Sequence, residues 1–214
     1  MQETCYATRV NQASAGLRER KKQQTREAIT RAALDRFVER GYDATTLAEI
    51  AEAAGVSTRT IFAYFPGKED ILFASFQTLR DSLTRALAER PGGRDALGTL
   101  RDFVVSVACA KTELDHKLEE IIGSDETLHS HKRARLSQLQ ELLAAAIADD
   151  LGSGPDDLRP QIAAASLSAA FEVLELHDRG LPPPYTPKEI AVAIDPVIAF
   201  VRAGLEAFPA PSAR

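Results

Sequence analysis

The sequence predicts an all-α protein, and three observations carry this prediction. Apolar residues recur at helical spacing along most of the 214 residues, and no segment shows the alternation of a strand. Glycine and proline are concentrated in short breaks between the periodic segments. The chain is 44% hydrophobic and has no tryptophan. We therefore expect a core made mainly of leucine, isoleucine, valine and alanine.

The N-terminal segment, residues 1–16, is polar and aperiodic, so we expect a disordered tail there. A helix is expected over about 17–40, followed by a stop signal at Gly41. Its apolar face carries Ile29, Ala33 and Phe37. Residues 1–26 carry six basic and two acidic side chains, although the whole chain has a formal net charge of -5. This asymmetry is a weak sign of a nucleic-acid contact at one end.

Two short helices follow, and each has a start signal. Thr46 and Glu49 have the spacing of a capping box. The apolar residues after Thr46 recur at i, i+3, i+4 and i+7, which predicts a buried stripe: Leu47, Ile50, Ala51 and Ala54. Gly55 ends this helix, and Ser57 caps the second one.

The second short helix carries Ile61 and Phe65 on its inner face and ends at Pro66-Gly67. A helix, a short glycine turn and a second helix form the helix-turn-helix pattern. The preceding helix over 17–40 can cover this pair. The three helices together predict a small DNA-binding domain over 17–67.

The rest of the chain is also predicted to be helical. A longer helix is expected from Lys68 to about Arg90. The connection over 180–187 contains four prolines and should be stiff. Pro196 lies inside the last helix and should kink it. Further helices are expected at about 94–111, 113–123, 125–150, 157–179 and 187–208.

The last two helices have compositions that permit close helix packing. Residues 162–176 are rich in alanine and serine. Residues 190–208 carry apolar side chains on one face: Ile190, Ile194, Val197, Val201, Leu205 and Phe208. Two interpretations remain open, which are packing within one subunit and a two-fold dimer interface through about 157–179 and 187–208.

The second helix of a helix-turn-helix places its N-terminal residues on base edges in the major groove. Those residues are Thr58, Arg59 and Thr60 in this chain. Arg59 is predicted to read a base, because arginine can donate two hydrogen bonds to guanine. The alternative is that Arg59 is a solvated surface charge.

Residues on both sides of these positions are predicted to hold the DNA backbone. Tyr64 can donate its hydroxyl to a phosphate, whereas Phe62 can make only apolar contacts with sugar or methyl groups. Thr46 and Lys68 each lie at a helix start, where the positive end of the dipole attracts phosphate. The alternative is that Lys68 is solvated and both rings belong to the core.

The stretch "TREAITRAALDRFVERGYDATTLAEIAEAAGVSTRTIFAYFPGKEDIL" resembles the tetracycline-repressor family of bacterial regulators, within a likeness that covers about residues 17–72. The resemblance implies a homodimer with a DNA-binding domain over 17–67, a helical effector-binding and dimerisation domain over 68–208, and a tail over 209–214. It also implies a palindromic operator that is released when a small molecule binds. The family usually has tyrosine at Phe62, so one phosphate hydrogen bond is lost here. By position, the family's DNA contacts fall on Thr46, Thr58, Arg59, Thr60, Phe62, Tyr64 and Lys68.

A narrower resemblance concerns "GLRERKKQQTREAI" and "SHKRARLSQLQELLAAAIADDLG". Both stretches resemble a subgroup that includes mycofactocin-system regulators and is associated with acyl-CoA-like ligands. In the first stretch, Arg18, Arg20 and Lys21 could extend into the minor groove, and a solvated helix start is the alternative. The family architecture implies an effector cavity, although each candidate for its lining can also be ordinary core. The candidates suit a mostly apolar ligand: Phe76, Leu79, Phe103, Val107, Leu139, Phe171 and Leu174.

Several classes of site are not expected. We find no nucleophile elbow, phosphate loop, zinc motif or pair of carboxylates in an apolar setting, so we predict no catalytic residue and no cofactor. Asp125 and His129 are four residues apart but lack a third metal-binding partner, so we predict no metal. Cys5 and Cys109 are too few for a disulfide framework. The longest apolar run, residues 142–148, is far shorter than the about 20 residues of a membrane span, and we expect a cytoplasmic protein.

Three functions are compatible with an all-α chain of this composition. The first is a ligand-responsive transcriptional regulator, most simply a repressor, and the helix-turn-helix pattern favours it. The second is an enzyme on a helical scaffold, which turnover of a bound ligand would support. The third is an architectural DNA-binding protein, which salt-dependent binding without sequence preference would support.

Overall fold

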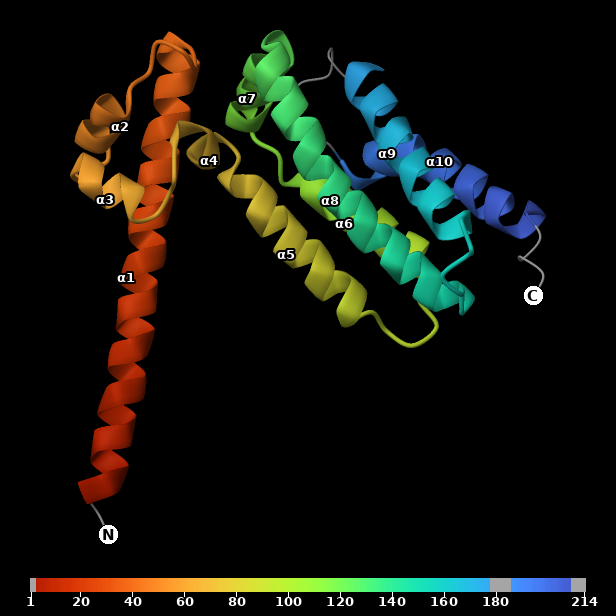
Figure 1. The fold of residues 1–214 in the computed structure, drawn as a ribbon, viewed down its shortest axis with the longest axis horizontal. Coiled ribbons are helices and arrows are strands. Elements are labelled where there is room, and N and C mark those ends of the chain that lie inside the picture. Colours follow the sequence, from red (N-terminus) through yellow and green to blue (C-terminus); the bar gives the residue numbers. More distant parts are fainter. Residues whose placement is uncertain (1–2, 178–185, 209–214) are drawn as a thin grey trace. The chain divides into compact units, whose positions relative to one another are not determined.

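A computed structural model describes residues 3–177 and 186–208, and every regular element in these ranges is an α-helix (Figure 1). The all-α prediction is confirmed. The predicted tail over 209–214 and most of the proline-rich connection over 180–187 lie outside the described residues. The chain divides into two compact units, Met1–Ala74 and Ser75–Arg214, which are called unit 1 and unit 2 below. The sequence analysis placed the corresponding boundary after Gly67.

Unit 1 is built on one long helix that covers three short ones. The helix α1 packs against α2 and α4, and α2 packs against α3. The most deeply buried core side chains are at most 1% exposed, and each isoleucine or phenylalanine among them contributes about 1.5–3 kcal/mol. The elements are α1 (Glu3–Arg40), α2 (Leu47–Ala53), α3 (Thr58–Phe62) and α4 (Lys68–Leu72). The most deeply buried core residues are Ile29, Ala33, Phe37, Ile50, Ile61, Phe65 and Ile71.

The start of α1 corrects the sequence prediction. A disordered tail was expected over residues 1–16, whereas α1 begins at Glu3. This segment contains no proline, and its only glycine is Gly16. Extending an existing helix costs far less than nucleating one, so a helix formed further along the chain can propagate through a polar segment that has no strong breaker.

The start signals of α2 and α3 are confirmed. The Thr46 hydroxyl accepts from the backbone N–H of Glu49, and the Glu49 carboxylate accepts from the backbone N–H of Thr46. Ser57 caps α3 by accepting from the Thr60 N–H at 3.0 Å. Gly55 has a φ of 66°, a left-handed conformation that glycine adopts without strain, and it makes the turn between the two helices.

Two predicted helices end earlier than the sequence indicated. The helix α3 ends at Phe62, well before Pro66-Gly67, although Phe65 still reaches the core. The single helix expected over 68–90 is two helices, α4 and α5 (Ala74–Ala88), interrupted at Phe73. The four residues 71–74 are all buried. A straight helix points four successive side chains around its whole circumference, so an interruption at Phe73 lets all four be buried.

Unit 2 is a bundle of helices around one apolar core. The long helix α8 lies beside α9, and α10 packs against both α6 and α9 (Figure 1). The elements after α5 are α6 (Ala96–Cys109), α7 (Glu113–Ser124), α8 (Glu126–Leu151), α9 (Arg159–His177) and α10 (Pro187–Ala207). The larger core residues are Leu83, Leu87, Leu97, Leu100, Leu143, Ile147, Leu167, Ile194, Ile198 and Val201.

The helix α10 continues unbroken through Pro196. Proline has no backbone N–H, so the carbonyl of Val192 lacks its usual helical donor, and the kink stays a prediction. Within the two described ranges, no helix is both long enough and apolar enough for a membrane crossing.

Candidate nucleic-acid interface

The helix α3 turns one side toward the core and presents a basic and an aromatic residue on the other. Ile61 is fully buried, whereas Phe62 is 56% exposed. Arg59 is also exposed, and its guanidinium makes no hydrogen bond or ion pair with any residue that the structure describes. An exposed guanidinium beside an exposed ring is suited to a partner that has both hydrogen-bond acceptors and apolar groups, as the edges of bases do.

The hydroxyl residues of α3 differ in what they have available. Thr58 is half-buried at the first helical position. The Thr60 hydroxyl is hydrogen-bonded to the Ser57 hydroxyl at 2.8 Å. Because Ser57 also caps α3, this bond ties Thr60 to the start of the helix. Among the three predicted base-contacting residues, Arg59 is therefore the one whose side chain is both exposed and without a hydrogen bond to a described residue.

Thr46 lies at the start of α2, as predicted, but its backbone N–H and its hydroxyl are both hydrogen-bonded to Glu49. Its hydroxyl donates to the Glu49 carboxylate at 2.8 Å. Glu49 is also paired with Arg40 at 2.7 Å. Hydrogen bonds from the backbone N–H and the hydroxyl of Thr46 hold the pKa of Glu49 below its usual range. A phosphate that approaches Thr46 must therefore compete with a nearby carboxylate.

Lys68 has a structural role that the sequence did not indicate. Its ammonium donates to the backbone carbonyls of Tyr42 and Thr45, at 2.6 and 3.1 Å. The same ammonium lies 4.1 Å from the centre of the Tyr42 ring. These contacts tie the loop between α1 and α2 to the start of α4. Two of the three N–H groups of the ammonium are thus used within unit 1.

Arg26 is a second residue that the sequence analysis missed. Its guanidinium donates to the backbone carbonyl of Tyr64 at 3.2 Å and lies 4.3 Å from the centre of the Phe65 ring. Both partners directly follow α3, so Arg26 fixes the end of this helix against α1. The position was detectable, because Arg26 lies three residues before Ile29 on the apolar face of α1.

The predicted arm residues Arg18, Arg20 and Lys21 are all exposed and belong to α1. A helix with its side chains is about 10–12 Å wide, whereas the minor groove is about 6 Å wide. The helix backbone therefore cannot enter the minor groove as an extended arm does. At 100° per residue, Arg18 and Arg20 also point to opposite sides of α1.

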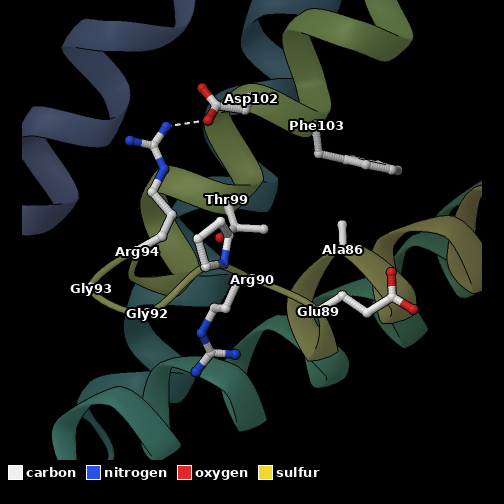
Figure 2. A pocket seen from close by; sticks show the side chains of 10 residues that line it. Ala86, Glu89, Arg90, Gly92, Gly93, Arg94, Thr99, Asp102 and Phe103 are labelled. Carbon is white, nitrogen blue, oxygen red and sulfur yellow. Dashed lines mark hydrogen bonds and ion pairs between the residues drawn. The ribbon is translucent and has the colours of Figure 1, made fainter.

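The seven residues predicted to line an effector pocket are all half-buried. Three of them pack against the core of unit 2: Phe103, Leu139 and Phe171. Unit 2 also has a hollow of about 580 Å³ beside the loop between α5 and α6 (Figure 2). Phe103 is the one predicted residue that lines this hollow.

The hollow is more polar than the predicted pocket. Figure 2 shows Arg94 paired with Asp102 at its edge, with Phe103 and Ala86 facing the same space. Arg90 instead points toward α8, where it pairs with Asp149 and Asp150. The hollow therefore combines one aromatic ring with a charged edge.

The helices α9 and α10 expose several large apolar side chains. Phe200 is 75% exposed and Val192 is 69% exposed on α10, although Ile194, Ile198 and Val201 of the same helix are buried. The helix is therefore apolar on two sides. The exposed residues on or beside these two helices are Leu158, Ile162, Val173, Val192, Phe200 and Phe208.

Within the part of the chain that the structure describes, no three His, Cys, Asp or Glu side chains are grouped so that they could hold a metal ion. His129 instead lies beside Arg133, with its Nδ1 atom 3.4 Å from the guanidinium.

Comparisons with known proteins point to one class. The family described as "Bacterial regulatory proteins, tetR family" matches residues 29–75. The chain is 30% identical over 178 residues to the helix-turn-helix transcriptional regulator TcmR of Streptomyces glaucescens, a match that covers 78% of this chain and 79% of TcmR. It is 39% identical over 88 residues to the probable regulator ArpR of Pseudomonas putida, which covers 40% of this chain and 41% of ArpR.

A solved structure of similar fold is that of NalD, the secondary repressor of the MexAB-OprM multidrug efflux pump in Pseudomonas aeruginosa. The TM-score is 0.61 at 24% identity, and the likeness covers 83% of this chain and 96% of NalD. TcmR, ArpR and NalD are named as regulators or repressors, and none is named as an enzyme.

Proposed function

The chain belongs to the tetR family of bacterial regulatory proteins, and from this premise we propose that it is a ligand-responsive repressor that binds a palindromic operator as a homodimer. In this proposal unit 1 binds DNA, and unit 2 binds a small effector and forms the dimer. As a bacterial DNA-binding regulator, the protein would act in the cytoplasm.

One observation carries the DNA-binding part of the proposal. Arg59 is exposed on α3 without a partner among the described residues, while the helix that bears it is fixed at both ends. Ser57 caps its start, and Arg26 holds the carbonyl of Tyr64 just after its end. A fixed helix with a free guanidinium loses little conformational freedom when it reads a guanine. Thr58 completes the groove contacts, Phe62 lies against a sugar of the DNA backbone, and Tyr64 and Lys68 contact phosphates.

The exposed apolar side chains of α9 and α10 support the dimer. A large ring such as Phe200, at 75% exposure, is unfavourable in water, and several such residues gather on these two helices. A two-fold axis through this face would bury the same residues from both protomers. The two α3 helices would then be related by the same axis, and the bound sequence would be palindromic.

The effector part of the proposal rests on the half-buried residues of unit 2. Side chains such as Phe76, Phe103 and Phe171 are neither fully packed nor fully solvated, which suits a ligand that is mostly apolar. The effector must bind one spacing of the two α3 helices better than the other, because equal affinity for both shifts no equilibrium. The ligand class that we propose for this effector is an acyl-CoA-like molecule.

Selection of bound DNA from a random duplex pool tests the proposal. The purified protein is mixed with the pool, bound duplexes are recovered over several rounds at a range of salt concentrations, and the products are sequenced. A palindromic consensus with two half-sites is the expected result. Enrichment without any consensus would contradict sequence-specific regulation and favour architectural binding.

The absence of tryptophan gives a direct test of the effector site. Phe103→Trp places a single indole fluorophore at the hollow, and Ser106→Trp places one at an exposed position of the same helix as a control. An acyl-CoA thioester should change the emission of the first variant only and should release the selected operator. No change in emission and no release with the thioester, the free acid or CoA would contradict an acyl-CoA-like effector at this site.

A further inference from the structure

One face of α1 changes its chemical character along the helix. Six residues follow one another on this face at steps of three or four: Arg18, Lys22, Arg26, Ile29, Ala33 and Phe37. The last three are fully buried in the core of unit 1. Arg26 is half-buried, and Arg18 and Lys22 are exposed. The face is therefore apolar where it covers the short helices and cationic where α1 continues past them (Figure 1).

Arg26 shows which way this face points. Its guanidinium contacts the carbonyl of Tyr64 and the ring of Phe65, which directly follow α3. Residues at steps of four lie above one another on a helix, so Arg18 and Lys22 project from the same side as Arg26. At 1.5 Å of rise per residue they lie about 12 and 6 Å further along the axis. Arg20 and Arg31 project from the opposite side.

Resting on the proposed function, we infer that Arg18 and Lys22 bind backbone phosphates of the DNA that flanks the half-site contacted by α3. Neither side chain forms an ion pair with a residue that the structure describes. DNA carries one phosphate charge per about 1.7 Å of helix axis, so two cations spaced along a rigid helix meet phosphates whatever the base sequence. Such contacts position a protein on the duplex without reading its sequence.

This inference changes the predicted role of the N-terminal cations. The helix does not enter the minor groove but lies along the backbone. Arg18 stays a DNA contact, Lys22 joins it, and Arg20 on the opposite side does not contribute. The protein therefore covers more DNA than the bases read by α3. Its affinity depends on the presence of this flanking DNA but not on the sequence of the flank.

A pair of double variants tests the inference. R18Q/K22Q and R20Q/R31Q each remove two positive charges from exposed positions of α1, and glutamine has a helix propensity close to that of lysine and arginine. Thermal melts by circular dichroism establish that both variants fold. Their affinities for the selected operator are measured at several salt concentrations, on a duplex with long flanks and on one trimmed to the consensus.

For R18Q/K22Q, the slope of log K against log salt should become less negative by about 1.8 per protomer on the long duplex. The wild type should bind the long duplex more tightly than the trimmed one, and this preference should be lost in R18Q/K22Q and kept in R20Q/R31Q. Equal changes in the two double variants, or no dependence on flank length in the wild type, would overturn the inference.

The same titrations against a scrambled long duplex separate this inference from the proposed function. A wild type that binds operator and scrambled duplexes equally contradicts the proposed function, but the salt slopes of the two double variants on either duplex still report the phosphate contacts. Retained operator selectivity with identical slopes for both double variants contradicts the phosphate contacts alone.

Discussion

Unit 1 and unit 2 bury their apolar side chains to different extents. Among the described residues, the large apolar side chains that unit 1 exposes are Leu17 and Phe62, and its buried apolar side chains are at most 8% exposed. Unit 2 exposes large apolar residues on or beside α9 and α10, of which Phe200 is the most exposed at 75%. Unit 1 thus completes its core within one chain, whereas unit 2 leaves an apolar surface that a second copy would cover.

The largest expected effect is a loss of the proposed dimer. Phe200→Glu places a charge in the proposed dimer interface. A buried phenylalanine contributes about 1.5–3 kcal/mol and occurs twice in a two-fold interface, so the dimer dissociation constant should rise about 100-fold or more. Sedimentation of the wild type and the variant over a range of concentrations measures this. Ser106→Glu, at an exposed polar position of α6, controls for the added charge. Equal association of all three proteins would contradict the proposed interface.

The next prediction distinguishes a role of Lys68 in the stability of unit 1 from a role in DNA binding. Lys68→Ala removes two hydrogen bonds that the ammonium donates to backbone carbonyls. A hydrogen bond that involves a charged group contributes about 1.5–3 kcal/mol to stability. Unit 1 should therefore unfold at a lower temperature, and binding to all duplexes should weaken. Lys21→Ala removes the same charge from an exposed position and should leave the melting temperature unchanged. Weaker binding by Lys68→Ala with an unchanged melting temperature would show that Lys68 acts on phosphate alone.

A smaller effect concerns the exposed ring of α3. Phe62→Tyr adds a hydroxyl to a side chain that is 56% exposed, so the stability of the unbound protein should hardly change. If this ring lies against the DNA backbone, the hydroxyl gains a phosphate hydrogen bond of about 0.5–1.5 kcal/mol in each half-site. Titration of the selected operator should show tighter binding. An affinity equal to that of the wild type would place the ring away from the phosphates.

The smallest effect is a pH dependence within unit 1. Hydrogen bonds from Thr46 lower the pKa of Glu49 in the folded protein, so Glu49 stabilises the fold above its unfolded pKa of about 4.3. This stabilisation is lost as the pH falls through the lower folded pKa. The difference in melting temperature between the wild type and Glu49→Gln should be constant near neutral pH and should shrink in acid. A difference that grows on acidification would contradict this role of Glu49.

The comparison of the two units also explains what the sequence could predict. The DNA contacts proposed for the helix-turn-helix and for Lys68 lie within residues 46–68, in one continuous stretch of caps, turns and apolar stripes. Local rules therefore predicted the capping box at Thr46, the cap at Ser57 and base reading by Arg59; the first two are confirmed, and the third stays a prediction. The contacts of Lys68 join segments about 25 residues apart, and no local rule indicates that its ammonium turns toward Tyr42.

Prediction was weaker for unit 2, and the reason is physical. The proposed pocket residues come from four helices between Phe76 and Leu174, and their direction depends on how each helix is rotated in the bundle. Periodicity identified the apolar face of α10 that became core, including Ile194 and Val201. It did not identify the second face with Val192 and Phe200. The break at Phe73 was also missed, because no glycine or proline marks it.

The central claim is that Arg59 reads a base from a helix held by Arg26 and Ser57. Selection from a random duplex pool is performed in parallel with the wild type, Arg59→Ala and Arg31→Ala, the last of which removes an exposed arginine from α1. We expect one palindromic consensus for the wild type and Arg31→Ala. For Arg59→Ala we expect lost preference at one guanine in each half-site, at a cost of about 1–3 kcal/mol per half-site. An unchanged consensus and unchanged operator affinity for Arg59→Ala would contradict base reading by Arg59.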